Sequence, residues 1–306
     1  MAEQSKLEKK LKAGHFVVCS EMGPPIGADP DFIRDKAENL KGYVDGVNVT
    51  DNQTAIVRMS SIAAAKIASE EGLEMIIQVT TRDRNRIGLQ SDILGASALG
   101  LRNILCLTGD HQVFGMDKGS KNVFDLGSVQ LIKVVNDMVH EGVLLNGKEM
   151  DTPPAMFIGG AANPFAEPFA MQMIKMEKKV EAGVQFFQTQ AIYNLEKFEY
   201  WMEEVRKRGL HERAYILAGI LPTRSVKALK MMKKHVAGMD VPDEVIERMA
   251  AADDRKAEGV KMAVEAIETV REIEGVSGIH LMPVAWEEIT PVVIEQASLY
   301  PRPEVE

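Results

Sequence analysis

The sequence predicts an α/β fold, a closed (β/α)8 (TIM) barrel, and three observations lead to it. Short apolar or β-branched runs bounded by turn residues occur eight times. Helix-period stretches separate consecutive runs, and several runs begin about 30 residues apart, roughly the length of one βα unit. Eight such units form a closed parallel barrel of about 250 residues or more, which a chain of 306 residues accommodates.

The expected strands are the runs richest in β-branched and apolar residues. They are HFVVCSE (15–21), VDGVNVT (44–50), EMIIQVT (74–80), RNILCLTGD (102–110), AMFIGGAAN (155–163), VQFFQTQ (184–190), AYILAGILP (214–222) and GIHLMPV (278–284). The expected helices are 31–41, 54–71, 88–99, 127–142, 168–182 and 195–208. The interval from 224 to 274 is long enough for three helices, so extra helices are expected after the seventh strand.

A doubly wound open sheet is the main alternative to the barrel. Its dinucleotide fingerprint, GxGxxG, does not follow the first strand. The long intervals before the fifth and eighth strands fit decorations of one barrel, and no Ser/Gly-rich linker divides the chain. We therefore expect residues 1–306 to form a single catalytic barrel domain.

Composition excludes several classes of protein. Apolar residues make up 45% and charged residues 26%, as in soluble globular proteins. A net charge of −9 and a pI near 5.4 count against binding to nucleic acid or to an anionic membrane surface. The N-terminal MAEQSKLEKKLKAG has a charged helix pattern rather than that of a signal peptide, and no apolar run approaches the roughly 18 residues of a membrane span. We expect a cytoplasmic protein.

The cysteines and histidines do not predict a metal site. Cys19 and Cys106 each lie inside an apolar strand-like run, where a thiol usually behaves as a small core hydrophobe. The six histidines form no i, i+4 pair, and no CxxC accompanies them. A zinc or iron–sulfur site built by this chain alone is therefore not expected.

Polar residues at the carboxyl ends of the strands are the candidates for the active site, because barrel enzymes place their chemistry there. These residues are Glu21, Thr50, Asp51, Gln78, Thr80, Thr108, Asp110, Asn163, Gln188 and Gln190. Amides and hydroxyls dominate, and no serine–histidine or cysteine–histidine pairing occurs at the strand ends. Such a rim suits hydrogen bonding to a heterocycle such as a pterin or a flavin edge.

Glu21 is the most informative of these residues. It ends the first strand, and Pro24 and Pro25 prevent that strand from continuing. Burial at an apolar barrel mouth disfavours the charged carboxylate, so Glu21 is expected to serve as an acid near neutrality. The alternative is that Glu21 pairs with an arginine of a neighbouring loop and only tethers it.

Two loops suggest further contacts. Arg82, Arg84 and Arg86 stand just before a helix, where cations and free helix N–H groups can form an anion site, although a solvated loop of alternating charges would look the same. In TGDH (108–111), Gly109 permits a tight turn that would bring Asp110 inward.

Several segments together resemble the methylenetetrahydrofolate reductase family, the flavin-dependent barrel enzymes of one-carbon metabolism. The segments are SEMGPP, VNVTDNQ, QVTTRDRNRIGLQSD, LGLRNILCLTGD, KKVEAGVQFFQTQAIYN and LAGILPTRS. They occur in the family's order and spacing over positions 20 to 225. The resemblance implies that reduced flavin passes a hydride to 5,10-methylenetetrahydrofolate and forms 5-methyltetrahydrofolate.

The resemblance also implies roles for individual residues. Glu21 matches the general acid, Asp110 an aspartate near the flavin pyrimidine edge and the pterin, and Gln190 a pterin contact. Thr50 matches a flavin contact and Lys179 a contact on the phosphate side of the cofactor. The residues expected to bind the cofactor are Thr50, Gln78, Thr80, Thr108, Asp110 and Lys179, and those expected to bind substrate are Glu21, Asp110 and Gln190.

Departures from the family pattern leave the cofactor form open. Gln78 stands where many relatives have histidine, and Thr108 where some have arginine. Gly159 and Gly160 replace a stretch that commonly contains tyrosine. FAD is expected, with FMN as the alternative.

Two other functions remain open from the sequence. One is a flavin-free pterin-binding methyltransferase barrel, and the other is a reductase subunit that receives electrons from a redox partner protein. The expected partners are the folate substrate, a nicotinamide donor (NADH or NADPH) or that redox protein, and further copies of the chain in an oligomer. The sequence identifies neither the donor nor the oligomeric state.

Overall fold

The computed structural model describes residues 4–305 and confirms the (β/α)8 barrel. Eight parallel strands follow one another around the ring in chain order, and β8 returns to pair with β1. The strands are β1 Val17–Met22, β2 Gly46–Val49, β3 Met75–Thr80, β4 Asn103–Leu107, β5 Phe157–Ala162, β6 Phe186–Ala191, β7 Tyr215–Ile220 and β8 Val276–Leu281.

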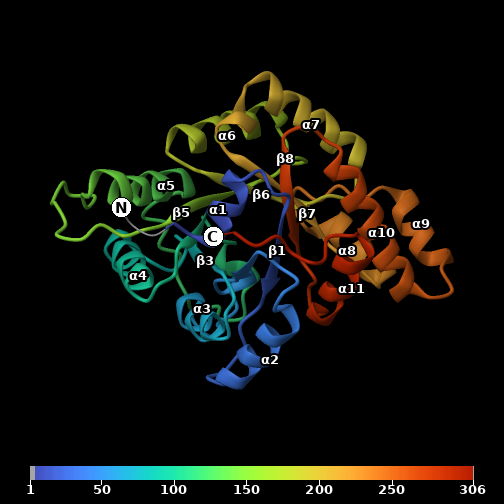
Figure 1. Cartoon of the computed structure of the whole chain (residues 1–306), viewed down its shortest axis with the longest axis horizontal. Coiled ribbons are helices and arrows are strands. Elements are labelled where there is room, and N and C mark those ends of the chain that lie inside the picture. Colours follow the sequence, from blue (N-terminus) through green and yellow to red (C-terminus); the bar gives the residue numbers. More distant parts are fainter. Residues whose placement is uncertain (1–3, 306) are drawn as a thin grey trace.

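Helices surround the ring of strands (Figure 1). The α-helices are α1 Lys6–Lys12, α2 Pro30–Leu40, α3 Ser61–Glu70, α4 Arg86–Ala98, α5 Ser128–Asn136, α6 Phe169–Glu181, α7 Leu195–Lys207, α8 Val226–His235, α9 Asp243–Ala251, α10 Arg255–Arg271 and α11 Thr290–Gln296. Short 3-10 turns occur at Gln53–Ala55, Gln112–Phe114, Leu210–Glu212 and Glu287–Ile289, and a π-helical turn at Asp137–Glu141. Helices α8, α9 and α10 all lie between β7 and β8, which confirms the extra helices after the seventh strand.

Several expected boundaries differ from the structure, and two of the differences have a clear physical reason. The helix expected from residue 54 begins at Ser61, because Asn52, Thr54 and Ala55 have positive φ angles that an α-helix cannot contain. The last strand spans Val276–Leu281 rather than 278–284. Pro283 has no backbone N–H to donate, so the ladder cannot extend through it.

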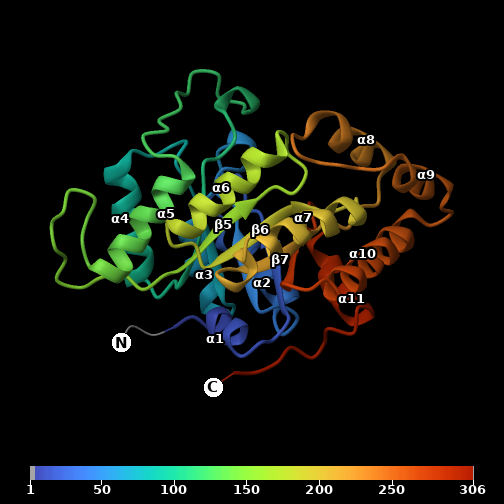
Figure 2. The same ribbon diagram turned by 90° about the horizontal axis from the view of Figure 1, so that it is seen from above.

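The lower half of the barrel interior is apolar. Phe157 and Phe186 stack with ring centroids 5.0 Å apart, and Leu7 and Leu11 of α1 close the layer from below. Figure 2 shows α1 and both chain ends at this end of the barrel, with α8 and the loop after β4 at the other. A Cβ atom on Gly159 would lie 2.3 Å from the Phe186 ring, so only glycine fits beside this aromatic layer.

Both cysteines are core residues, as predicted. Cys19 and Cys106 are fully buried, and burial raises the pKa of the Cys106 thiol to about 12. A thiol in that state is neither a nucleophile nor a metal ligand at neutral pH.

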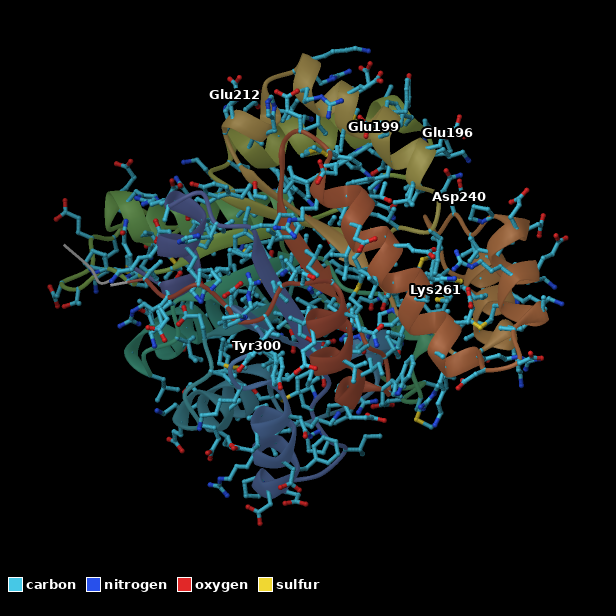
Figure 3. The ribbon with its side chains drawn as sticks, turned by 45° about the vertical axis from the view of Figure 1, so that its right-hand side comes forward. Glu196, Glu199, Glu212, Asp240, Lys261 and Tyr300 are labelled. Carbon is cyan, nitrogen blue, oxygen red and sulfur yellow. The ribbon has the colours of Figure 1, made fainter. Side chains whose placement is uncertain are left out.

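Side chains on the outside of the barrel attach the inserted helices to it. Asp240, between α8 and α9, accepts a hydrogen bond from Asn194 (3.0 Å) and forms an ion pair with Lys197 (2.5 Å) at the start of α7. Figure 3 shows Asp240 beside the end of α7 that carries Glu196. No helix within residues 4–305 is both long and apolar enough to cross a membrane.

A buried carboxylate fastens the closed end of the barrel. Asp45, whose side chain is fully buried, accepts from the Val18 backbone N–H (2.7 Å), from Lys10 (2.6 Å) and from Arg302 (2.6 Å). Arg302 also donates to the Phe16 carbonyl at 2.6 Å. One side chain thus joins α1, β1 and the C-terminal segment.

We expect Asp45→Asn to lower the free energy of unfolding by about 3–5 kcal/mol, because it leaves two cations without their buried partner. The control is Asp31→Asn, which breaks an ion pair with Arg34 in which the Asp31 side chain is 78% exposed and should change stability by less than about 1 kcal/mol. Urea unfolding of the three proteins measures both effects. Equal stabilities for wild type and Asp45→Asn would contradict this interpretation of the network.

Candidate active site

The carboxyl end of the barrel holds a large cavity. Its volume is about 760 Å³, within the usual range for cofactor and substrate sites. Residues of β3, β4, β5, β6 and β8 line it together with side chains of α5 and α6. The cavity therefore lies where a barrel enzyme places its chemistry.

Polar side chains from separate strands form a floor above the apolar layer. Glu21 Oε2 accepts from Gln78 Nε2 at 3.3 Å and lies 3.6 Å from His280 Nε2. Asn48 Nδ2 donates to the Ser20 carbonyl and lies 3.2 Å from His280 Nδ1. Since this amide nitrogen can only donate, Nδ1 accepts, and the neutral imidazole carries its proton on Nε2, toward Glu21.

Glu21 stands between two cavities. Gln78 and His280 line the large one, whereas Glu21 lines a second cavity of about 200 Å³ together with Lys36 and Arg58. Its side chain is 14% exposed, and within residues 4–305 no arginine forms an ion pair with it; the neighbour at 3.6 Å is His280. The alternative role of Glu21, tethering an arginine loop, is therefore not supported.

One end of the large cavity is cationic. Lys175, Lys178 and Lys179 of α6 line it, and so does the N-terminal turn of α5. Lys179 Nζ donates to the Ala161 carbonyl at 2.5 Å, and burial lowers the pKa of Lys179 to about 8. Three lysines beside a helix N-terminus favour an anionic group at this end.

The arginine loop after β3 is paired internally, which argues against an anion site. The expected alternative, a solvated loop of alternating charges, does not hold either, because the Arg82 side chain is only 2% exposed. Arg82 pairs with Asp83, Arg84 with Asp51 and Asp92, and Arg86 with Asp125. Arg82 also donates to the backbone carbonyls of Asn52 and Asp110. Through these contacts the loop is linked to the segments that follow β2 and β4. None of its three arginines is among the residues that line the large cavity.

A comparison with known protein families shows to which family the chain belongs. The family model described as methylenetetrahydrofolate reductase matches residues 6–298, nearly the whole chain. The chain belongs to the methylenetetrahydrofolate reductase family.

Two curated relatives carry the family name. A probable methylenetetrahydrofolate reductase (NADPH) of Caenorhabditis elegans is 22% identical over 197 residues, which cover 62% of this chain and 26% of the relative. Methylenetetrahydrofolate reductase 2 of Schizosaccharomyces pombe (strain 972 / ATCC 24843) is 25% identical over 213 residues, which cover 67% of this chain and 32% of the relative. The match thus spans between a quarter and a third of these longer proteins.

A solved structure shares the fold. It is a protein from Clostridium thermocellum described as binding two copies of 5-methyl-5,6,7,8-tetrahydrofolic acid. The TM-score is 0.65 at 15% identity, and the match covers 96% of this chain and 98% of the other. At this identity the likeness shows the common barrel.

Apart from Glu21, the residues expected to bind cofactor or substrate fall into two groups. The first group lines the large cavity and consists of Gln78, Thr108, Lys179 and Gln190. The second does not line it: Thr50 is buried with Oγ1 lacking a partner among residues 4–305, Thr80 is held by Asp51, and Asp110 is exposed. The ligand contacts of both groups stay predictions.

Sequence analysis missed His280 and Asn48. Both were read as parts of strand-like runs, and only barrel closure brings β8 beside β1 and β2. The available signal was alternation: His280 and Met282 are two residues apart in the run GIHLMPV, and both line the large cavity. A histidine at an interior position of an apolar run was the clue.

The buried state of Lys179 predicts a pH dependence of stability. The ordinary lysine pKa is 10.5, and in the folded protein it falls to about 8. Between these values the unfolded chain holds a proton that the folded chain has released, so raising the pH favours folding. We expect the free energy of unfolding of wild type to rise relative to Lys179→Met from pH 8 to 10.5. Urea unfolding at stepped pH measures it.

The control for this series is Lys178→Met, an exposed lysine on the same helix. Its stability should follow that of wild type through the whole pH range. Parallel curves for wild type and Lys179→Met would show that Lys179 is not held in a desolvated position.

Proposed function

We propose that this chain reduces 5,10-methylenetetrahydrofolate to 5-methyltetrahydrofolate, that a bound flavin, FAD or FMN, takes part, and that residues 1–306 act as one catalytic barrel. The observation that carries the proposal is Glu21, which Gln78 and His280 hold beside the large cavity. Membership of the family and the names of the relatives support the reaction. The folate bound by the Clostridium thermocellum barrel supports the ligand class.

The volume of the cavity and the side chains that line it fit a flavin. Its volume of about 760 Å³ admits a large heterocyclic ligand, and Gln78, Gln188 and Gln190 supply amides for the ring edge. Both amide atoms of Gln188 lack a partner among residues 4–305, as expected for a group that faces a ligand. The lysines of α6 would hold the phosphate side. When bound, reduced flavin supplies the hydride.

Glu21 supplies the proton. The product carries its methyl group on N5, so the bond between the one-carbon unit and N10 breaks, and N10 needs a proton as it leaves. Gln78 and His280 both contact Oε2 of Glu21, which leaves Oε1 to hold that proton. The apolar layer below the floor excludes water from this side of the carboxyl group.

The electron donor to the flavin is proposed to be NADH or NADPH, or a redox partner protein. The Caenorhabditis elegans relative is named for NADPH, which supports a nicotinamide. Anaerobic mixing with each nicotinamide, followed by the flavin absorbance, distinguishes the cases. Reduction by one nicotinamide identifies the donor, whereas reduction by neither indicates the protein partner.

A flavin-free methyltransferase barrel is the second candidate. One observation favours it: the Clostridium thermocellum barrel is described as binding 5-methyl-5,6,7,8-tetrahydrofolic acid, the folate that carries a methyl group. The colour of the purified protein separates the two functions. A yellow protein that bleaches on reduction supports the reductase, and a colourless one that binds no added FAD or FMN supports the methyltransferase.

We expect Glu21→Gln to bind and reduce flavin normally but to lose about 10²- to 10⁴-fold in folate reduction, because only the folate half-reaction needs the proton. Stopped-flow absorbance measures the two half-reactions separately. The control is Glu199→Gln on the outer face of α7, labelled in Figure 3, which should retain both. Unchanged folate turnover in Glu21→Gln would reject the acid role.

We expect Asp110→Asn to raise the midpoint potential of the bound flavin, because loss of a nearby negative charge favours the reduced anion. Anaerobic titration against a reference dye measures the potential. A potential that falls or stays constant would remove Asp110 from the flavin site.

A further inference from the structure

Gln188 differs from the other amides around the large cavity. It lies on β6, is 3% exposed and lines the cavity, yet neither Nε2 nor Oε1 has a hydrogen-bond partner anywhere in residues 4–305. Gln78 donates to Glu21, and Gln190 accepts from the Ala191 backbone N–H. Gln188 has neither kind of contact.

The barrel itself explains why Gln188 finds no protein partner. Its register neighbours are Ala161 on β5 and Leu217 on β7, and neither has a polar side chain. Phe186, two residues earlier on the same face of β6, belongs to the apolar layer below. These two register neighbours therefore offer no side chain that could pair with its amide.

Such a side chain is unfavourable in the folded protein alone. An amide removed from water without a partner destabilises the fold, whereas methionine or leucine would fill the same place without that penalty. The position becomes favourable when a ligand in the cavity pairs with both amide atoms.

We propose that Gln188 is a ligand-binding residue that recognises a cyclic amide edge, an adjacent ring N–H and C=O, on the heterocycle in this cavity. Its Oε1 accepts from the ring N–H, and its Nε2 donates to the ring carbonyl. The inference rests on the proposed function, since the pterin ring and the pyrimidine ring of flavin both carry this edge. It adds to Gln190 a specificity residue one layer deeper in the barrel.

The test compares Gln188→Met with Gln185→Met, a matched control just before β6. Gln185 Oε1 accepts from the Ile158 backbone N–H at 2.9 Å, so its replacement breaks a hydrogen bond of the fold. We expect Gln188→Met to unfold at equal or higher urea concentration than wild type and to bind its ligand about 10- to 100-fold more weakly, as two neutral hydrogen bonds are lost. Gln185→Met should unfold earlier and keep its affinity.

Calorimetric titration of the flavin-free proteins with FMN, FAD and 5-methyltetrahydrofolate identifies which ring Gln188 contacts. If Gln188→Met binds flavin more weakly, Gln188 contacts the flavin edge; if it binds folate more weakly, Gln188 contacts the pterin edge. Either result supports the inference. Unchanged affinities for all three ligands overturn it, and so does a loss of stability in Gln188→Met.

Failure of the proposed function is a separate result. Wild-type protein that binds neither flavin nor folate rejects the proposed function. In that case the unfolding comparison still decides whether Gln188 faces a ligand: higher stability of Gln188→Met supports this, and lower stability overturns it.

Discussion

The contact of Glu21 with Gln78 and His280 is the interaction on which the site depends. It joins β1, β3 and β8 above the apolar layer, and Asn48 fixes the histidine from β2. Both neighbours contact one carboxyl oxygen and leave the other free for a reaction. Closure of the barrel is what brings these strands together, so the site exists only when the ring is complete.

The two ends of the barrel have different tasks. At the closed end, the Asp45 network and the stacked aromatic rings of Phe157 and Phe186 stabilise the fold. At the open end, amides and lysines line a cavity that the apolar layer seals from below, and Glu21 contacts Gln78 and His280 of its lining. Gln188 at the open end has no hydrogen-bond partner among residues 4–305, which lowers the stability of the folded protein. The contacts at the closed end offset that loss.

Patterns along the chain predicted the strands, the inserted helices and the position of Glu21 near the carboxyl end of the first strand. Those features depend on alternation and on turn residues, which are local. The pairing of Arg84 with Asp51 and Asp92 was not predictable, since its partners come from separate segments. The same holds for the unpaired state of Gln188, which depends on Ala161 and Leu217 across two neighbouring strands.

The central claim is that Glu21 Oε1 gives its proton to N10 of the folate. A crystal structure with flavin and 5-methyltetrahydrofolate bound tests it most directly. The account predicts Oε1 within about 3.2 Å of N10, or one water molecule away, with Gln78 and His280 still at Oε2. Folate bound elsewhere, or Glu21 turned away from it, would contradict the account.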